Sequence, residues 1–190
     1  MKIAVIDATK KRFQFKQGMD ERLLTDEKIK VIFNSNWIGD YIFAFDNIKD
    51  RRLVERKLQS IRNYTDKSLK FYVFCAFNHI TPDSYYPEFW SSDIADVFER
   101  VKVLISYQAL PYIMRYKDYE KSKYRGMYVT LARWCNQPSF IKKMSFREFC
   151  TANGVNSASY RYMCEFERDN PDIADKYFNM KWDDFKGDRK

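Results

Sequence analysis

Apolar and polar positions along the chain follow two alternating patterns. Short, nearly continuous apolar runs predict four strands, near residues 13–17, 41–46, 70–77 and 110–116. Apolar residues at helical spacing predict four helices, over about residues 25–33, 50–64, 92–107 and 127–136. Strand and helix alternate as in successive βα units, so we expect a parallel sheet with right-handed crossovers. Nearly continuous apolar strands favour the same fold, because parallel sheets are usually covered on both faces.

Beyond residue 144 the pattern changes to short helices. Residues 145–148 (SFRE) have the spacing of a capping box, which starts a helix. A further helix is expected over residues 157–168, and Asn170-Pro171 has the residue types that open another. The chain is thus expected to divide into an α/β part over residues 1–144 and an α-helical appendage over residues 145–190.

Composition places the chain among globular proteins. Hydrophobic residues make up 45% of its 190 residues and aromatic residues 18%, enough for one good core. No apolar run approaches the ~20 residues of a membrane-spanning helix. Residues 1–7 are too short and too soon charged for a signal peptide. We therefore expect a cytoplasmic protein whose four cysteines are thiols and not disulfides.

The net charge of +8 makes an acidic partner plausible, such as nucleic acid or a phosphorylated substrate. The positive charge is spread along the chain, so a lysine-rich solvated surface is an equally open interpretation. Residues 112–134 mix tyrosine with arginine, a mixture that binds nucleic acid or nucleotides and that also serves ordinary helix–sheet packing.

Polar residues stand at or just beyond the ends of the predicted strands. They are Asp20, Arg22, Asp46, Asn78 and Arg115. Ligands of parallel α/β proteins sit at the carboxyl ends of the strands, so these side chains are candidates for one shared site. The alternative is that each starts a loop or caps a helix. For Asp46 the two readings are a carboxylate that accepts hydrogen bonds from ligand hydroxyls, or a turn into residues 47–50.

Familiar catalytic and metal motifs are absent from the sequence. It contains no Walker loop, GxGxxG, GxSxG or HExxH. The four cysteines are far apart in sequence and His79 is the only histidine, so we expect no self-contained metal site. Cys75 lies in an apolar run typical of a packed core thiol, and Cys135 has no nearby histidine to activate it. His79 follows the third predicted strand, where it is either a general base or a solvated loop residue.

Five segments resemble, in order, the later half of radical SAM proteins of a kind common in phage and gut-bacterial genomes. They are residues 17–25 (QGMDERLLT), 43–46 (FAFD), 71–78 (FYVFCAFN), 111–116 (PYIMRY) and 132–136 (ARWCN). Members of that family are partial (β/α)6 barrels that hold a [4Fe–4S] cluster and S-adenosylmethionine at the carboxyl ends of the strands. The resemblance implies that the four predicted strands are the third to sixth of such a TIM-like barrel, and that residues 1–8 end the preceding helix.

The resemblance also implies a pocket for S-adenosylmethionine and substrate. On this alignment its lining would include Gln17, Asp20, Arg22, Asp46, Asn78 and Arg115. The family's CxxxCxxC motif is absent, so the chain by itself should anchor no cluster and catalyse no radical reaction. It would be the C-terminal portion of such a protein, with a missing N-terminal half that carries the cluster as a possible partner. The alternative is a basic nucleic-acid or nucleotide-binding module without catalysis.

Overall fold

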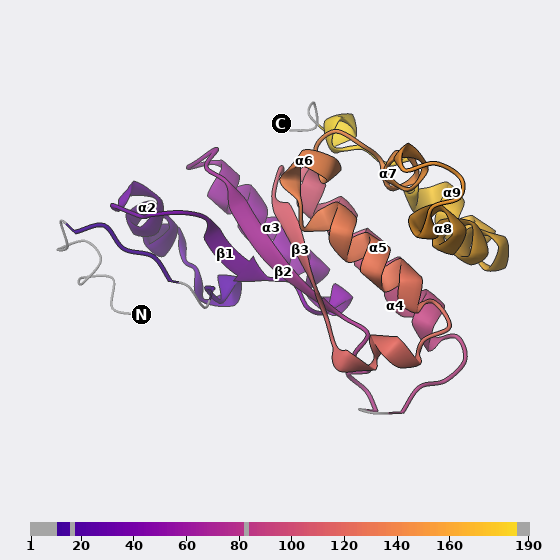
Figure 1. Ribbon diagram of the computed structural model, residues 1–190. Helices are drawn as coiled ribbons and strands as arrows, with labels where there is room; N and C mark the ends of the chain where they lie inside the picture. The colour runs from indigo at the N-terminus through magenta and orange to yellow at the C-terminus, as the bar shows by residue number, and fades with distance from the viewer. Residues whose placement is uncertain (1–10, 16–17, 82–83, 186–190) are drawn as a thin grey trace.

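A computed structural model describes residues 11–15, 18–81 and 84–185. Its elements form a succession of strands and helices followed by helices alone (Figure 1). In chain order they are η1 (Glu21–Leu23), α2 (Asp26–Asn34), β1 (Tyr41–Ala44), η2 (Ile48–Asp50), α3 (Arg51–Arg62), β2 (Leu69–Cys75), α4 (Phe89–Ser106), β3 (Leu110–Arg115), η3 (Lys117–Lys121), α5 (Arg125–Cys135), α6 (Pro138–Ile141), α7 (Phe146–Ala152), α8 (Ala158–Asp169), α9 (Pro171–Tyr177) and η4 (Trp182–Phe185). None of the described helices has the length and apolar character needed to cross a bilayer.

The sheet is parallel and its strands are neighbours in chain order, β1-β2-β3. Phe43 of β1 pairs with Phe71 of β2, which pairs in turn with Pro111 of β3. Helix α3 joins β1 to β2 and helix α4 joins β2 to β3, so the predicted βα alternation and the parallel pairing of these three strands are confirmed.

The expected barrel is not seen. Within the described residues the sheet has three strands and is open, and three strands are too few to close on themselves. Phe13 of the expected first strand makes only an isolated parallel bridge to Trp37. The Met19 N–H donates to the Ile42 carbonyl of β1 at 2.7 Å, whereas Phe13 bonds to residues 36 and 38, ahead of β1. Residues 16–17, between them, lie outside the described residues. Residues 1–8, expected to end a helix, also lie outside them.

The two faces of the sheet differ in how far they are covered. On one face alternate residues such as Phe43, Phe71 and Val73 are fully buried, and α4 and α5 pack there. The other face, called the open face below, is half-buried or exposed apart from Leu110 at its amino end. Its other side chains are Ile42, Ala44, Lys70, Tyr72, Phe74, Tyr112 and Met114. An uncovered face is unusual for a parallel sheet.

The outer edge of β3 is closed by one side chain. The Asn136 side-chain amide, just after α5, accepts a hydrogen bond from the Ile113 N–H at 2.7 Å and donates one to the Ile113 carbonyl at 3.1 Å. It thereby occupies both backbone groups that a further strand would use at this position. Strand edges with unpaired groups invite association, and this contact blunts that edge.

Buried polar groups join the ends of β1 and β2 to α4. Arg100 of α4 is 2% exposed, and its Nη1 donates to the carbonyls of Phe45, Asp46 and Phe74 at 3.0, 3.2 and 2.8 Å. Burial lowers the pKa of the Arg100 guanidinium, and the charge of Asp93 opposes that shift. These bonds fix where the two strands end relative to the helix that follows them.

The Asp93 carboxylate, two turns before Arg100 on the same helix, holds the chain beyond β2. Its Oδ2 accepts hydrogen bonds from the Ala76 N–H and the Tyr128 hydroxyl, each at 2.8 Å. Ala76 has a φ of 63°, a left-handed conformation that is costly for a residue with a Cβ and is maintained here by this bond. Burial raises the pKa of the Asp93 carboxyl, so its charge depends on these donors and on Arg100.

The C-terminal helices extend the core away from the sheet and lie at the opposite end of the molecule from β1 (Figure 1). Their buried side chains are continuous with the core between sheet and helices. The capping box of Ser145 and Glu148 and the opening of α9 at Pro171 are confirmed. Helices α5 and α8 approach most closely at Gly126, where a Cβ would lie 2.3 Å from the Tyr162 ring.

Replacing Arg100 with methionine should destabilise the protein by about 3–5 kcal/mol, because three strand-end carbonyls lose their donor and Asp93 loses its compensating charge. Urea unfolding followed by circular dichroism measures this. Arg52→Met, on the exposed side of α3, is the matched control and should change stability by about 0.5 kcal/mol or less. Equal effects of the two substitutions would contradict the role given to Arg100.

Replacing Gly126 with alanine should lower the melting temperature, because the new methyl group overlaps the Tyr162 ring. In a Tyr162→Ala background the same change should be neutral or stabilising by up to about 1 kcal/mol, since alanine is the better helix former. Gly126→Ala should therefore lower the melting temperature of the native chain and leave unchanged or raise that of the Tyr162→Ala variant. Destabilisation of the same size in both backgrounds would rule out the contact as the cause.

Candidate functional site

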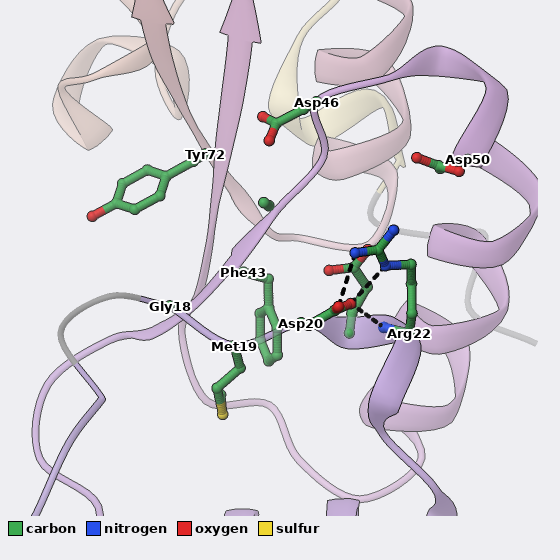
Figure 2. A pocket seen from close by; sticks show the side chains of 10 residues that line it. Gly18, Met19, Asp20, Arg22, Phe43, Asp46, Asp50 and Tyr72 are labelled. Carbon is green, nitrogen blue, oxygen red and sulfur yellow. Dashed lines mark hydrogen bonds and ion pairs between the residues drawn. The ribbon is translucent and has the colours of Figure 1, made fainter. Parts of the chain in front are cut away.

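A pocket opens at the carboxyl end of β1, on the side of the open face (Figure 2). Its volume is about 320 Å³, within the range of small-molecule sites (~300–1,000 Å³). The lining residues are Gly18, Met19, Asp20, Glu21, Arg22, Phe43, Ala44, Asp46, Asp50 and Tyr72. The structure thus brings together three of the residues expected at the strand ends: Asp20, Arg22 and Asp46.

Asp20 and Arg22 form a preformed pair on one side of this pocket. Asp20 caps η1 by accepting the Arg22 N–H at 3.0 Å, and the Arg22 guanidinium donates from Nε at 2.8 Å and from Nη2 at 2.9 Å. The fork holds the pKa of the Asp20 carboxyl below its usual range. Both side chains are exposed, so the pair mainly fixes the direction of two charged groups and adds little to stability.

Glu21 is the pocket residue that sequence reasoning missed. It is only 6% exposed, although it stands between two exposed charged residues. Burial raises the pKa of its carboxyl, and the neighbouring Asp20 carboxylate adds to the rise. A buried carboxyl with a raised pKa in a pocket is a candidate functional group. No sequence pattern singles it out, because a glutamate inside a charged cluster is usually solvated.

Asp46, the charged residue that follows the apolar strand β1, bonds to the neighbouring strand. Its Oδ1 accepts the Phe74 N–H of the neighbouring strand at 3.0 Å and so extends the pairing of β1 and β2 by one hydrogen bond. The expected turn into residues 47–50 is capped by a different side chain, Asn47, which accepts the Lys49 N–H at 3.0 Å. Asp46 therefore has a structural role with one oxygen and still lines the pocket with an exposed carboxylate.

The remaining expected site residues lie elsewhere. Asn78 is buried and its amide organises its own loop: Oδ1 accepts the Ile80 and Thr81 N–H groups, and Nδ2 donates to the Ser84 carbonyl. Arg115 lies over the Tyr119 ring, 4.5 Å from its centroid, and is not part of the pocket lining. Gln17 lies outside the described residues.

The cysteines do not suit an iron–sulfur cluster. All four are free thiols spread over β2, α5, α7 and α8, and Cys75, Cys135 and Cys150 are buried. Burial raises the pKa of all three, to about 12 for Cys150, which disfavours the thiolates that such clusters require. Across the described ranges, no three histidine, cysteine, aspartate or glutamate residues are grouped for metal binding.

The pocket is acidic although the chain is basic. Four carboxyl side chains line it against one guanidinium, and that guanidinium is already paired with Asp20. A ligand with a positive charge and hydroxyl groups therefore suits it better than a phosphate. Next to it, an apolar hollow of about 400 Å³ shares Gly18, Met19 and Asp20 and is otherwise lined by Phe15, Leu23, Leu24 and Lys28.

No family model matches the chain, and no curated protein or solved structure matches it significantly.

Glu21 should make stability depend on pH. The pKa of its carboxyl is higher in the folded than in the unfolded protein. The protonated carboxyl therefore contributes stability that is fully present below the unfolded pKa, about 4.3, and that is lost as pH rises through the folded pKa. Glu21→Gln should therefore raise the free energy of unfolding at neutral pH and have no such effect at pH 3. Urea unfolding at a series of pH values measures this.

Asp20→Asn provides a control of opposite sign. Arg22 lowers the pKa of the Asp20 carboxyl. The ionised Asp20 carboxylate therefore contributes stability that is present above the unfolded pKa and that is lost as pH falls through the folded pKa. This variant should be less stable than the native chain at neutral pH. If the two substitutions shift the pH profile in the same direction, the assignment of Glu21 as the buried carboxyl is wrong.

Proposed function

We propose that this chain is the C-terminal portion of a radical SAM-type protein and contributes part of the pocket for S-adenosylmethionine and substrate. The observation that carries the proposal is the carboxylate-lined pocket at the carboxyl end of β1. Parallel α/β proteins bind their ligands at that end of the strands. The order of strands and helices agrees with the resemblance, which supplies the identity of the ligand.

The charges of the pocket support this ligand over a nucleotide. S-adenosylmethionine carries a sulfonium and an ammonium group and offers ribose hydroxyls. Asp46 and Glu21 can accept hydrogen bonds from hydroxyls or neutralise a cation, and acidic residues recognise ribose in this way in other parallel α/β folds. The phosphates of a nucleotide would instead face four carboxyl groups. The adjacent apolar hollow offers room for an uncharged part of the ligand.

The chain by itself is proposed to bind and not to catalyse. Bound S-adenosylmethionine would supply an electrophilic sulfonium, whose reductive cleavage needs a cluster that the buried thiols of this chain do not anchor. A partner segment with the CxxxCxxC motif would have to supply it. Such a segment would add on the β1 side, beyond the residues that pair with β1 through the Met19 N–H, because Asn136 closes the outer edge of β3.

Calorimetric titration with three related ligands tests the proposal. The chain should bind S-adenosylmethionine most tightly, S-adenosylhomocysteine, which lacks the sulfonium charge, less tightly, and the anionic ATP least. Asp46→Asn keeps an acceptor for the Phe74 N–H and removes the charge. It should weaken S-adenosylmethionine binding about tenfold or more, the loss expected for one charge-assisted hydrogen bond of about 1.5–3 kcal/mol.

The matched control is Asp172→Asn, an exposed aspartate on α9. It removes the same charge from the chain and should leave the affinity for S-adenosylmethionine unchanged. ATP binding as tight as S-adenosylmethionine binding, or equal affinity of the native chain and Asp46→Asn, would contradict the proposed ligand.

A further inference from the structure

Aromatic rings form a continuous surface over the β2–β3 part of the open face. Tyr72 and Tyr112 have ring centroids 5.6 Å apart, and Phe74 lies 5.8 Å from Tyr116. Phe77 extends the surface beyond the strand end, 5.0 Å from Tyr116. Tyr112 is 38% exposed although it sits in the middle of a strand. Exposed rings on a sheet provide flat stacking area at low entropic cost.

Basic side chains follow this aromatic surface along the chain. Between residues 110 and 125 the sequence has five basic and two acidic residues. One acidic residue, Asp118, is buried, accepts the Tyr85 hydroxyl at 2.7 Å and pairs with Lys121 at 3.1 Å. Lys123 pairs with Asp169 at 3.5 Å. Lys117 is exposed and lies over the ring of Tyr116. Arg115, which pairs with the buried Cys75, leaves β3 on the covered face and lies over the ring of Tyr119. Charge and stacking area therefore alternate at one end of β3.

We propose that this aromatic and basic surface binds single-stranded nucleic acid. Bases would stack on Tyr112 and its neighbours, and phosphates would be neutralised by Lys117. This combination of aromatic rings with a cationic track is what single-strand binding requires. Such binding would accept many base sequences, because every base has a flat face that can stack on a ring. The two sites share Tyr72, but Tyr112 and Lys117 are not part of the pocket lining, so the inference does not depend on the ligand proposed for the pocket.

Other occupants fit the surface less well. A duplex keeps its bases stacked inside the helix, so the rings could not reach them. A second copy of this chain would bring further positive charge against Lys117, in a protein that already carries a net charge of +8. A single strand offers negative charge together with unstacked bases, which is complementary to both features.

Fluorescence anisotropy with labelled oligonucleotides over a salt series tests the inference. A 12-nucleotide single strand, as RNA or DNA, should bind, and a duplex of the same length should bind more weakly. Tyr112→Ala should reduce single-strand affinity by about fivefold to a hundredfold, the range for loss of one stacked base. Lys117→Gln should lower the slope of log affinity against log salt by about 0.7, the contribution of one phosphate contact.

Two control variants separate a specific surface from diffuse attraction. Tyr64→Ala removes a tyrosine that is 42% exposed beyond α3, and Lys143→Gln removes an exposed charge beyond α6. Both should leave the affinity and the salt slope unchanged, and thermal melting should show all four variants folded. The inference is overturned if no single strand binds at low salt, if the duplex binds as well, or if the control variants weaken binding as much as Tyr112→Ala and Lys117→Gln.

A measurement of mass in solution tests whether a second copy of the chain occupies the aromatic surface. Sedimentation should find a monomer with or without Tyr112→Ala. A dimer that this substitution dissociates would assign the surface to a second copy of the chain and overturn the inference.

Discussion

The buried guanidinium of Arg100 is the interaction on which the described structure most depends. It donates to backbone carbonyls at the carboxyl ends of both β1 and β2 while it sits on the helix that leaves β2. A buried charge is tolerated only where its hydrogen bonds are made and an opposite charge is near, and here carbonyls and Asp93 meet those needs. Strand ends, helix position and the left-handed residue Ala76 are therefore fixed together.

That constraint explains why the pocket lies where it does. Arg100 satisfies the strand-end carbonyls from the helix-covered face, so the opposite side of the same strand ends remains accessible. Asp46 lies at this junction: its carbonyl accepts from Arg100, and its carboxylate accepts from the Phe74 N–H. The loop of residues 18–22 completes the pocket by pairing with β1 through the Met19 N–H. The candidate site is thus built on the most rigidly bonded part of the sheet.

The distribution of charge separates two regions of one face. Carboxyl groups gather at the end of β1, whereas arginine and lysine gather with tyrosine after β3. A net charge of +8 describes neither region, because binding responds to the local potential. The acidic pocket favours cationic ligands with hydroxyl groups, and the basic aromatic surface favours anionic ligands with flat rings. The pocket and the rings of Tyr72, Phe74 and Tyr112 lie on a sheet face that no described helix buries.

The local structure can be predicted from the residue pattern alone. Apolar periodicity identified three of the sheet's strands, the helices between them and their parallel order, and cap residues such as Thr25 and Ser145 identified helix starts. These features depend on neighbours in sequence, so a pattern can reveal them. The sequence also pointed to Asp20, Arg22 and Asp46, because residues after parallel strands must share one edge of the sheet.

Only the tertiary structure decided which side chains are buried and what they contact. It enclosed Glu21 in the pocket, used Asn78 inside a loop, turned Arg115 onto a ring, and left the sheet open on one face where a barrel was expected. Each of these outcomes depends on contacts between residues that are distant in sequence or on the exact course of a loop. The free energy of burial and of hydrogen bonding is set by such contacts, and neither periodicity nor composition records them.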